Sequence, residues 1–301
     1  MSTKKNPEKS IFGLATMAIA ATLLFCAIAA TGQNIPNVPN GNLSGAEFES
    51  EMTFMLLQIQ ADVQGNLNDL DLEVANAAQN LSALGLDGDA ARGVLHKLLE
   101  SDSNLAEAVT FSKEGKIVAA ECKGCEGGEG ADISRQEQIA YLLKTKTPTF
   151  SKQFLLVEGY KGTSLAYPVF SPQGEFLGGI SAIIEPDKLL NAVVSPQLHF
   201  GIDNRSNITD YSFWLMHLDG LIAYDRDASQ IGKYLFEDPL YKPYPSLLDL
   251  GKKMITARSG HGYYSFQVTE GNKKVVTKES YCSTAGLHGR EWRLAVTKMM
   301  D

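Results

Sequence analysis

The stretch from residue 165 to residue 180 reads LAYPVFSPQGEFLGGI and has the pattern of two strands joined by a tight turn. Apolar residues dominate both arms, which we expect to cover residues 164–170 and 175–184. Residues 171–174 (SPQG) separate them, and serine, proline and glycine in such a run favour a turn. The stretch therefore predicts an antiparallel β-hairpin.

The elements around this hairpin indicate a duplicated module. Before it we expect a first hairpin, a helix and a third strand, at residues 106–109 with 115–120, 134–144 and 154–158. A short helix follows at residues 187–194. The same order then returns at residues 212–217 with 221–224, 245–257, 260–267, 273–281 and 292–298. Two copies of one α+β module are predicted, each burying one sheet face under its helices.

A long helix is predicted ahead of both modules. From Phe48 to Leu81, apolar residues recur every three or four positions without an intervening proline. A helix of roughly forty residues would be about 60 Å long, so it must lie along two stacked modules or along a partner helix.

The N-terminus predicts export across a membrane. Lys4, Lys5 and Lys9 precede the uncharged run of residues 11–30, which is long enough to span a hydrocarbon core of about 30 Å. Lysines on this side alone predict a cytoplasmic N-terminus and an exterior body. A retained anchor is favoured by the length of the run; a cleaved signal is the alternative, because residues 27–29 (AIA) fit a signal-peptidase site.

Composition and motifs argue for a folded protein that is not an enzyme. Of its 301 residues, 44% are hydrophobic and 21% are charged, and the formal net charge of −8 opposes nucleic-acid binding. No H-E-x-x-H, G-x-S-x-G or P-loop pattern occurs. We therefore expect no catalytic residues, no cofactor and no metal site.

Two cysteines lie in a glycine-rich segment, at Cys122 and Cys125. In an exported protein we expect them to close a small surface disulfide. The alternatives are a redox motif or half of a zinc site, although no second pair of ligands completes one. The sequence leaves the pairing with Cys282 open.

Several of these segments resemble one known family. The hairpin at 165–180 is similar to the "PV-turn-G-xx-LG" hairpin of Cache sensor domains. Residues 217–225 (HLDGLIAYD), with 230–233 (QIGK), resemble the signature of the membrane-proximal Cache module. Residues 258–262 (RSGHG) and 291–296 (EWRLAV) resemble its later strands.

The resemblance implies an α+β double Cache fold, with two tandem PAS-like modules, antiparallel sheets and a long N-terminal helix behind a membrane-spanning or signal helix. The implied domains are a cytoplasmic stub with anchor or signal (1–32), a linker (33–45), the long helix (46–88), a membrane-distal module (89–198) and a membrane-proximal module (199–301).

The family implies a sensor-type protein that binds a small polar molecule outside the cytoplasm. Because the sequence stops at Asp301, directly after the last strand, we expect no signalling output domain. The alternative is a structural or interaction module that forms a homodimer through the long helix or assists another membrane protein. The expected location is the cell membrane, crossed once, or the exterior if the N-terminal segment is cleaved.

The family binds its ligands in the distal module, where aromatic and polar side chains supply the candidates. These are Arg135, Tyr141, Lys152, Tyr160, Ser164 and Tyr167, with Arg135 and Lys152 able to meet an anionic group. In the proximal module, Asp225 could bind a ligand or cap the loop that follows it. The amino-acid-binding members carry an Arg-x-Trp-Tyr run and an aspartate that would fall at Ile183, so that specificity is not carried over.

Overall fold

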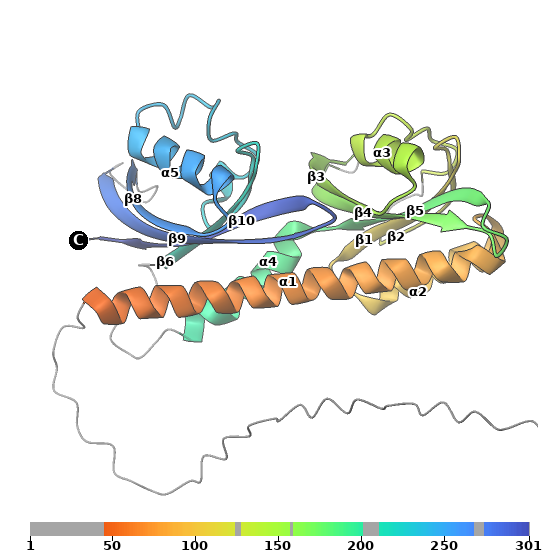
Figure 1. Cartoon of the computed structure of the whole chain (residues 1–301), viewed down its shortest axis with the longest axis horizontal. Coiled ribbons are helices and arrows are strands. Elements are labelled where there is room, and N and C mark those ends of the chain that lie inside the picture. Colours follow the sequence, from red (N-terminus) through yellow and green to blue (C-terminus); the bar gives the residue numbers. More distant parts are fainter. Residues whose placement is uncertain (1–44, 124–127, 157–158, 201–210, 268–273, 301) are drawn as a thin grey trace, which may run out of the picture. The chain divides into compact units, whose positions relative to one another are not determined.

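The computed structural model describes residues 45–123, 128–156, 159–200, 211–267 and 274–300 (Figure 1). The predicted anchor or signal segment, the predicted linker up to residue 44 and Cys125 lie outside this part of the chain. Within the described ranges, no helix is both long and apolar enough to cross a bilayer.

Helix α1, Gly45–Leu84, is a single helix of 40 residues, as the periodicity predicts. One face of it is fully buried, at Met52, Ile59, Val63, Leu67, Leu70, Val74 and Leu81. The helix ends where Gly85 takes a φ of +87° and donates its N–H to the carbonyl of Leu81 at 2.9 Å. Glycine adopts this left-handed conformation without a side-chain clash, which is why the helix stops here.

The first module contains a sheet of five antiparallel strands and two helices. Its elements are α2 Gly88–Ser101, β1 Leu105–Ser112, β2 Ile117–Cys122, α3 Glu137–Thr145, β3 Thr149–Leu155, β4 Lys161–Phe170 and β5 Phe176–Ile184. The strand order is β2-β1-β5-β4-β3. Strand β3 begins five residues before the predicted strand at 154–158 and overlaps that prediction only at Phe154 and Leu155.

The second module follows helix α4, Pro186–Phe200, and has the same plan. Its elements are β6 Tyr211–His217, β7 Ile222–Asp225, η2 Ala228–Gln230, α5 Pro245–Thr256, β8 Gly260–Gln267, β9 Val275–Leu287 and β10 Arg290–Met299. The order β7-β6-β10-β9-β8 repeats that of the first sheet, strand for strand. The predicted α+β class, with two antiparallel sheets and a long N-terminal helix, is confirmed.

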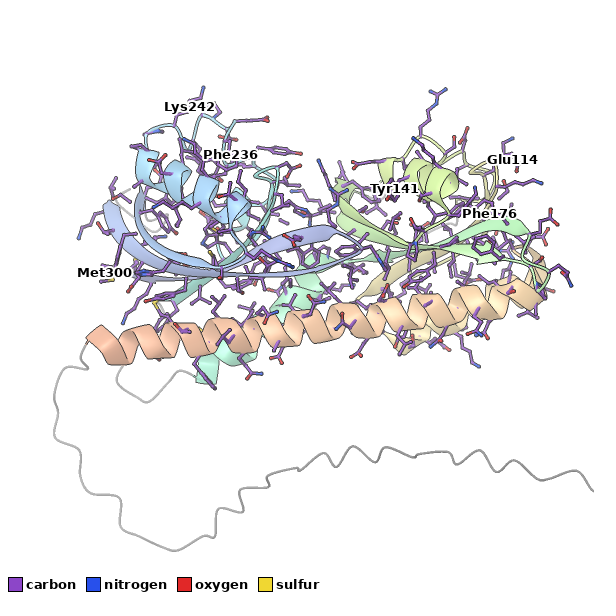
Figure 2. All side chains as sticks on the ribbon, in the orientation of Figure 1. Glu114, Tyr141, Phe176, Phe236, Lys242 and Met300 are labelled. Carbon is purple, nitrogen blue, oxygen red and sulfur yellow. The ribbon has the colours of Figure 1, made fainter. Side chains whose placement is uncertain are left out.

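Each sheet has α1 on one face and a shorter helix on the other. Figure 1 shows α1 passing along both sheets, while α3 and α5 lie on the opposite side. The side chains between α1 and the two sheets, drawn in Figure 2, form one continuous core that includes Leu165 and Ile180 of the first module and Leu294 and Trp292 of the second. On this face α1 is therefore shared by the two modules.

The opposite faces keep separate cores. Beneath α5, a cluster that includes Trp214, Met216 and Met254 fills the second module. Beneath α3, a smaller cluster contains Phe111, Ile139 and Leu142.

The hairpin at 165–180 is the β4–β5 hairpin, and its two glycines have a packing reason. A Cβ on Gly179 would lie 2.4 Å from the Phe111 ring, and one on Gly178 would lie 2.0 Å from the Phe111 carbonyl oxygen. Strand β5 can lie this close to β1 only because both side chains are absent.

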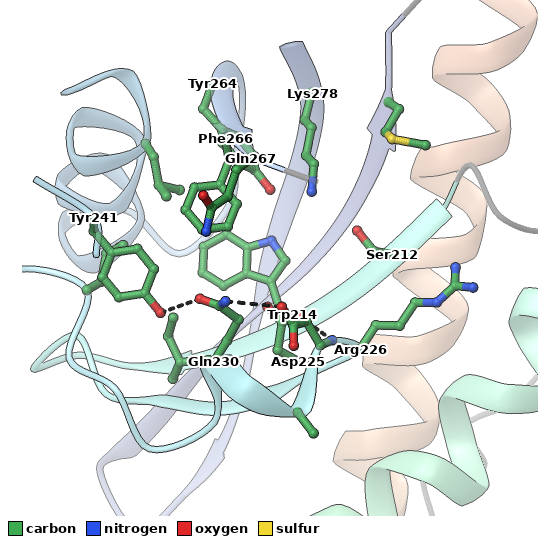
Figure 3. A pocket seen from close by; sticks show the side chains of 16 residues that line it. Ser212, Trp214, Asp225, Arg226, Gln230, Tyr241, Tyr264, Phe266, Gln267 and Lys278 are labelled. Atoms are coloured by element: carbon green, nitrogen blue, oxygen red, sulfur yellow. Dashed lines mark hydrogen bonds between the residues drawn. The ribbon is translucent and has the colours of Figure 1, made fainter. Parts of the chain in front are cut away.

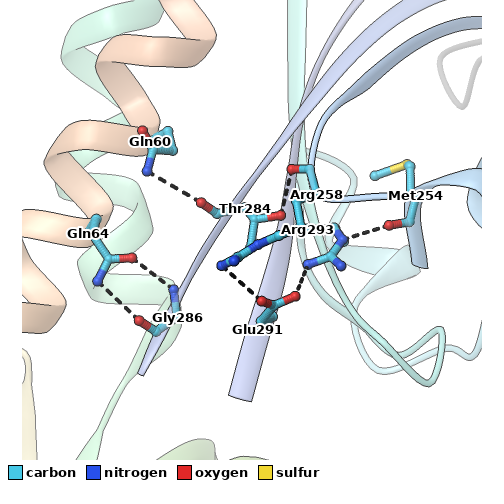
Figure 4. A network of polar contacts seen from close by, with 8 residues as sticks. All are labelled: Gln60, Gln64, Met254, Arg258, Thr284, Gly286, Glu291 and Arg293. Atoms are coloured by element: carbon cyan, nitrogen blue, oxygen red, sulfur yellow. Dashed lines mark hydrogen bonds and ion pairs between the residues drawn. The ribbon is translucent and has the colours of Figure 1, made fainter. Parts of the chain in front are cut away.

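Polar contacts fix α1 against the second sheet (Figure 4). The amide of Gln64 donates to the Gly286 carbonyl at 3.0 Å and accepts from the Gly286 N–H at 3.0 Å. One turn earlier, Gln60 donates to the carbonyl of Thr284 at 3.3 Å. The helix therefore bonds to the backbone of β9 as well as packing on it.

Candidate ligand-binding site

A cavity of about 420 Å³ lies in the second module, between its sheet, α5 and the loop that follows β7 (Figure 3). Aromatic and apolar side chains make up much of its wall: Trp214, Ile222, Leu235, Tyr241, Leu247, Tyr264, Phe266 and Met299. The polar lining comes from Ser212, Asp225, Arg226, Asp227, Gln230, Gln267 and Lys278. This size and this mixture are typical of small-molecule sites.

The strand register brings the main polar groups of the cavity to one face of the sheet. Asp225 of β7 is paired with Trp214 of β6, so the two side chains share a face. Lys278 of β9 is paired with Tyr264 of β8 on one side and with Met299 of β10 on the other. Five strands thus contribute to a single wall.

The loop after β7 is held by a chain of hydrogen bonds. The Asp225 Oδ1 atom accepts the N–H of Asp227 at 2.8 Å, and Asp227 in turn accepts from Gln230 at 3.2 Å. Gln230 is buried and accepts the Tyr241 hydroxyl at 2.7 Å. These contacts orient Asp225 and close the lower side of the cavity in Figure 3.

Burial shifts the pKa of two of the charged groups that line this cavity, Asp225 and Lys278. It raises the pKa of Asp225 to about 7, although the Asp227 N–H and the positive charge of Lys278 act in the opposite direction. Burial lowers the pKa of Lys278, and the negative charges of Asp225 and Asp227 oppose this shift. Shifts of this kind gather at functional sites.

A second cavity, of about 370 Å³, lies at the junction of the two modules. It is lined by Glu137, Gln138 and Tyr141 of α3, by Thr149 and Phe150 of β3, and by His288, Gly289 and Arg290 of the β9–β10 turn. Arg290 already bonds to Glu137 at 3.0 Å and to the Phe150 carbonyl at 3.4 Å, so its charge is largely satisfied.

The six residues predicted for the first module do not gather in one cavity. Tyr141 lies on α3 (Figure 2) and lines the junction cavity. Lys152 pairs with Asp219 of the second module at 2.8 Å. Arg135 is exposed in the turn before α3, and Tyr160 is half-buried in the turn before β4.

Ser164 and Tyr167 point to opposite faces of the first sheet. The Ser164 hydroxyl is fully buried, 2.8 Å from the hydroxyl of Ser181. The Tyr167 hydroxyl donates to Asp71 of α1 at 2.7 Å. Both side chains already have partners within the protein.

Asp225, the candidate predicted for the second module, lines the larger cavity and also bonds to the loop that follows it. The residues predicted from the sequence do not include Trp214, Lys278, Tyr264 or Phe266. Trp214 could have been found from the alternation along residues 211–217 opposite Asp225, whereas Lys278 required knowledge that β9 pairs with both β8 and β10.

The cysteines are described in part. Cys122 is disulfide-bonded, and the predicted partner Cys125 lies outside the described residues. Cys282 is a buried free thiol whose pKa is raised by burial.

Comparison with known proteins identifies sensor domains. Residues 65–186 match the family described as "HK/GC/Chemotaxis protein-like, sensor domain". No curated protein matches the chain significantly.

Similar solved structures cover most of the chain. An extracellular ligand-binding receptor from Desulfohalobium retbaense is 29% identical with a TM-score of 0.66, covering 85% of this chain and 41% of that one. This chain therefore spans less than half the length of that receptor.

Two further structures share the fold at lower identity. The ligand-binding domain of the Pseudomonas aeruginosa amino acid chemoreceptor PctB, in complex with L-Arg, has a TM-score of 0.62 at 16% identity and covers 85% of this chain and 97% of its own. The ligand-binding domain of the Pseudomonas fluorescens chemoreceptor CtaA, in complex with L-serine, has a TM-score of 0.60 at 16% identity. The match covers 84% of this chain and 98% of that domain.

Proposed function

We propose that this chain carries a double Cache sensor domain of the HK/GC/chemotaxis protein-like type. On this premise, it binds a small polar molecule outside the cytoplasm. The observation that carries the proposal is the cavity of about 420 Å³ in the second module, where aromatic walls surround Asp225 and Lys278. Binding, rather than catalysis, is the activity that the family supports.

The finer organisation is part of the same proposal. The first module would be the membrane-distal Cache module and the second the membrane-proximal one, held at the membrane by the N-terminal segment. The neighbours described as extracellular or as chemoreceptor domains support this exterior location.

A homodimer through α1 is the partner arrangement that the surface favours. Phe54, Leu57 and Leu72 are 69%, 56% and 61% exposed on the side of α1 that faces away from both sheets. Light scattering of the detergent-solubilised full chain is expected to give a dimer mass, and Leu72→Glu is expected to give a monomer. A monomer mass for the unaltered chain would remove this part of the proposal.

Thermal unfolding of the full chain with candidate ligands tests the binding function. A ligand at about one hundred times its Kd stabilises the native state by about 2.7 kcal/mol, which corresponds to about 5–10 °C in Tm for a domain of this size. The compounds to be screened are amino acids, amines, carboxylates and purines. No shift with any of them would contradict the proposal.

Two matched variants identify which cavity is used. If the ligand lies in the second module, Asp225→Asn should reduce the shift while Tyr141→Phe leaves it unchanged. The reverse result would assign the ligand to the junction cavity and to Tyr141.

A further inference from the structure

Two opposite charges face the second-module cavity without neutralising each other. Asp225 enters from the end of β7, and Lys278 enters from β9 (Figure 3). Among the residues that the structure describes, no ion pair joins them, although each influences the ionisation of the other.

Each of these groups has unused bonding capacity. Among the described residues, Asp225 accepts one hydrogen bond, from the Asp227 N–H, and a carboxylate can accept several. Lys278 lies 5.8 Å from the centre of the Phe266 ring, and within the described ranges its ammonium makes no hydrogen bond or ion pair. An ammonium has three donors, so a half-buried lysine without acceptors is costly unless something else supplies them.

The other charges lining the cavity are engaged with the protein. Arg226 donates to the carbonyl of Tyr211 at 3.0 Å. Asp227 accepts from the N–H of Ser229 at 3.0 Å and from Gln230. This leaves Asp225 and Lys278 as the charged pair available to a ligand.

The aromatic wall beside these two groups presents ring faces. The Trp214 indole N–H donates to the Thr297 hydroxyl at 3.1 Å, so its polar edge is occupied and its ring remains for contact. Phe266 and Tyr264 extend this surface along β8. Such faces bind hydrocarbon and stabilise a nearby cation.

We infer that this cavity binds a dipolar ligand, whose amine pairs with Asp225, whose acidic group pairs with Lys278, and whose carbon body packs on Trp214. The inference rests on the proposed function and specifies its ligand class. An amine without an acid would leave Lys278 unpaired beside a second positive charge. An acid without an amine would leave Asp225 unpaired beside a second negative charge. A ligand that carries both charges satisfies the two groups at once.

Two sets of matched compounds test the inference by calorimetry and thermal unfolding of the full chain. One set is L-phenylalanine, phenethylamine and 3-phenylpropionate; the other is γ-aminobutyrate, butylamine and butyrate. In at least one set, the dipolar compound should bind ten times or more as tightly as both compounds that carry a single charge.

Variants then assign the two ends of the ligand. Lys278→Met should weaken the dipolar compound at least tenfold without weakening its amine counterpart, and Asp225→Asn should weaken both. Asp249→Asn and Lys252→Met, which remove an exposed charge pair on α5, are controls that should change neither. The Tm and circular dichroism of each ligand-free variant establish whether it is folded. If Asp225→Asn does not fold, the result for Lys278→Met alone decides the question.

The outcomes separate this inference from the proposed function. If, in both sets, a compound with a single charge binds as tightly as its dipolar counterpart, or if Lys278→Met has no effect, the dipolar inference is overturned while small-molecule binding stands. If none of the six compounds binds, the dipolar inference fails. The binding function itself fails if the wider screen also gives no ligand.

Discussion

At the scale of single residues, Asp225 is a carboxyl group whose protonation is coupled to folding. Its raised pKa, about 7, means that between about pH 4 and pH 7 the native state holds a proton that the unfolded chain has released. The contribution of this group to stability is therefore present at low pH and is lost as the pH rises through about 7. The charges that modulate it are those of Lys278 and Asp227.

Replacing Asp225 with asparagine should remove this pH dependence. From pH 5 to pH 8, the free energy of unfolding of the unaltered chain should fall relative to that of Asp225→Asn. Each unit of pKa shift corresponds to about 1.4 kcal/mol, and the water that reaches the open cavity reduces this figure. Urea unfolding of both proteins at the two pH values measures the difference, and equal responses would contradict the raised pKa.

His217 should produce the opposite pH dependence. It is 2% exposed, neither ring nitrogen has a hydrogen-bond partner among the described residues, and burial lowers its pKa to about 4. Below about pH 6.5, His217 is therefore protonated in the unfolded chain but stays neutral in the native state. The stability contributed by neutral His217 is lost as the pH falls toward 4.

His217→Phe keeps an aromatic ring against Trp292, whose centroid lies 6.2 Å away, and removes the titrating group. Between pH 7.5 and pH 4.5, this variant should lose less stability than the unaltered chain in the same urea experiment. Because two unpaired polar atoms disappear, its stability at pH 7.5 should be equal or higher by about 1 kcal/mol. A larger loss at low pH than in the unaltered chain would exclude a neutral, buried histidine.

Single residues also mark the limit of prediction from the sequence. Asp225 could be selected because it ends a predicted hairpin with a recognisable turn. Lys278 could not, since its position in the cavity depends on the register of β9 against β8 and β10, and on the pairing of β10 with β6, which is far away in the sequence. The candidates of the first module were chosen by residue type, and folding gives Lys152, Ser164 and Tyr167 partners that a sequence does not reveal.

At the scale of elements, side chains of α1 bond to the backbone of β9 in addition to packing on the strand. Gln64→Ala removes both hydrogen bonds to Gly286 and is expected to cost about 1–3 kcal/mol. It should also speed hydrogen exchange at the Gly286 amide. Gln60→Ala, which removes one longer bond, is the matched comparison and should cost less. Equal costs for the two variants would contradict the assigned role of Gln64.

The elements were predictable where local pattern dominates. The periodicity of α1 and the turn of the β4–β5 hairpin fix these structures from nearby residues. Strand β3 was placed too late, because the apolar run beginning at Phe154 looks like a strand, whereas pairing with β4 begins at Thr149. Only the pairing partner determines that boundary.

At the scale of the whole described unit, the shared core predicts that the two modules unfold together. Leu165 of the first module and Leu294 of the second are both fully buried in the core that includes α1. Leu165→Ala and Leu294→Ala should each cost about 2–5 kcal/mol and should lower the temperature of one common transition. Leu155→Ala, at a side chain that is 67% exposed, is the control and should change little.

Differential scanning calorimetry measures this coupling. Two separate transitions, each sensitive to only one of the core variants, would show that the modules fold independently and that α1 does not unite them.

Asp71 illustrates what this architecture permits. Its carboxylate accepts the hydroxyl of Tyr167 at 2.7 Å and lies 2.7 Å from a ring nitrogen of His288, so one side chain of α1 is bound to both modules. Sliding α1 by one turn, about 5.4 Å, would break these contacts and the Gln64–Gly286 pair at the same time. Contacts from α1 to both modules therefore oppose axial sliding of the helix.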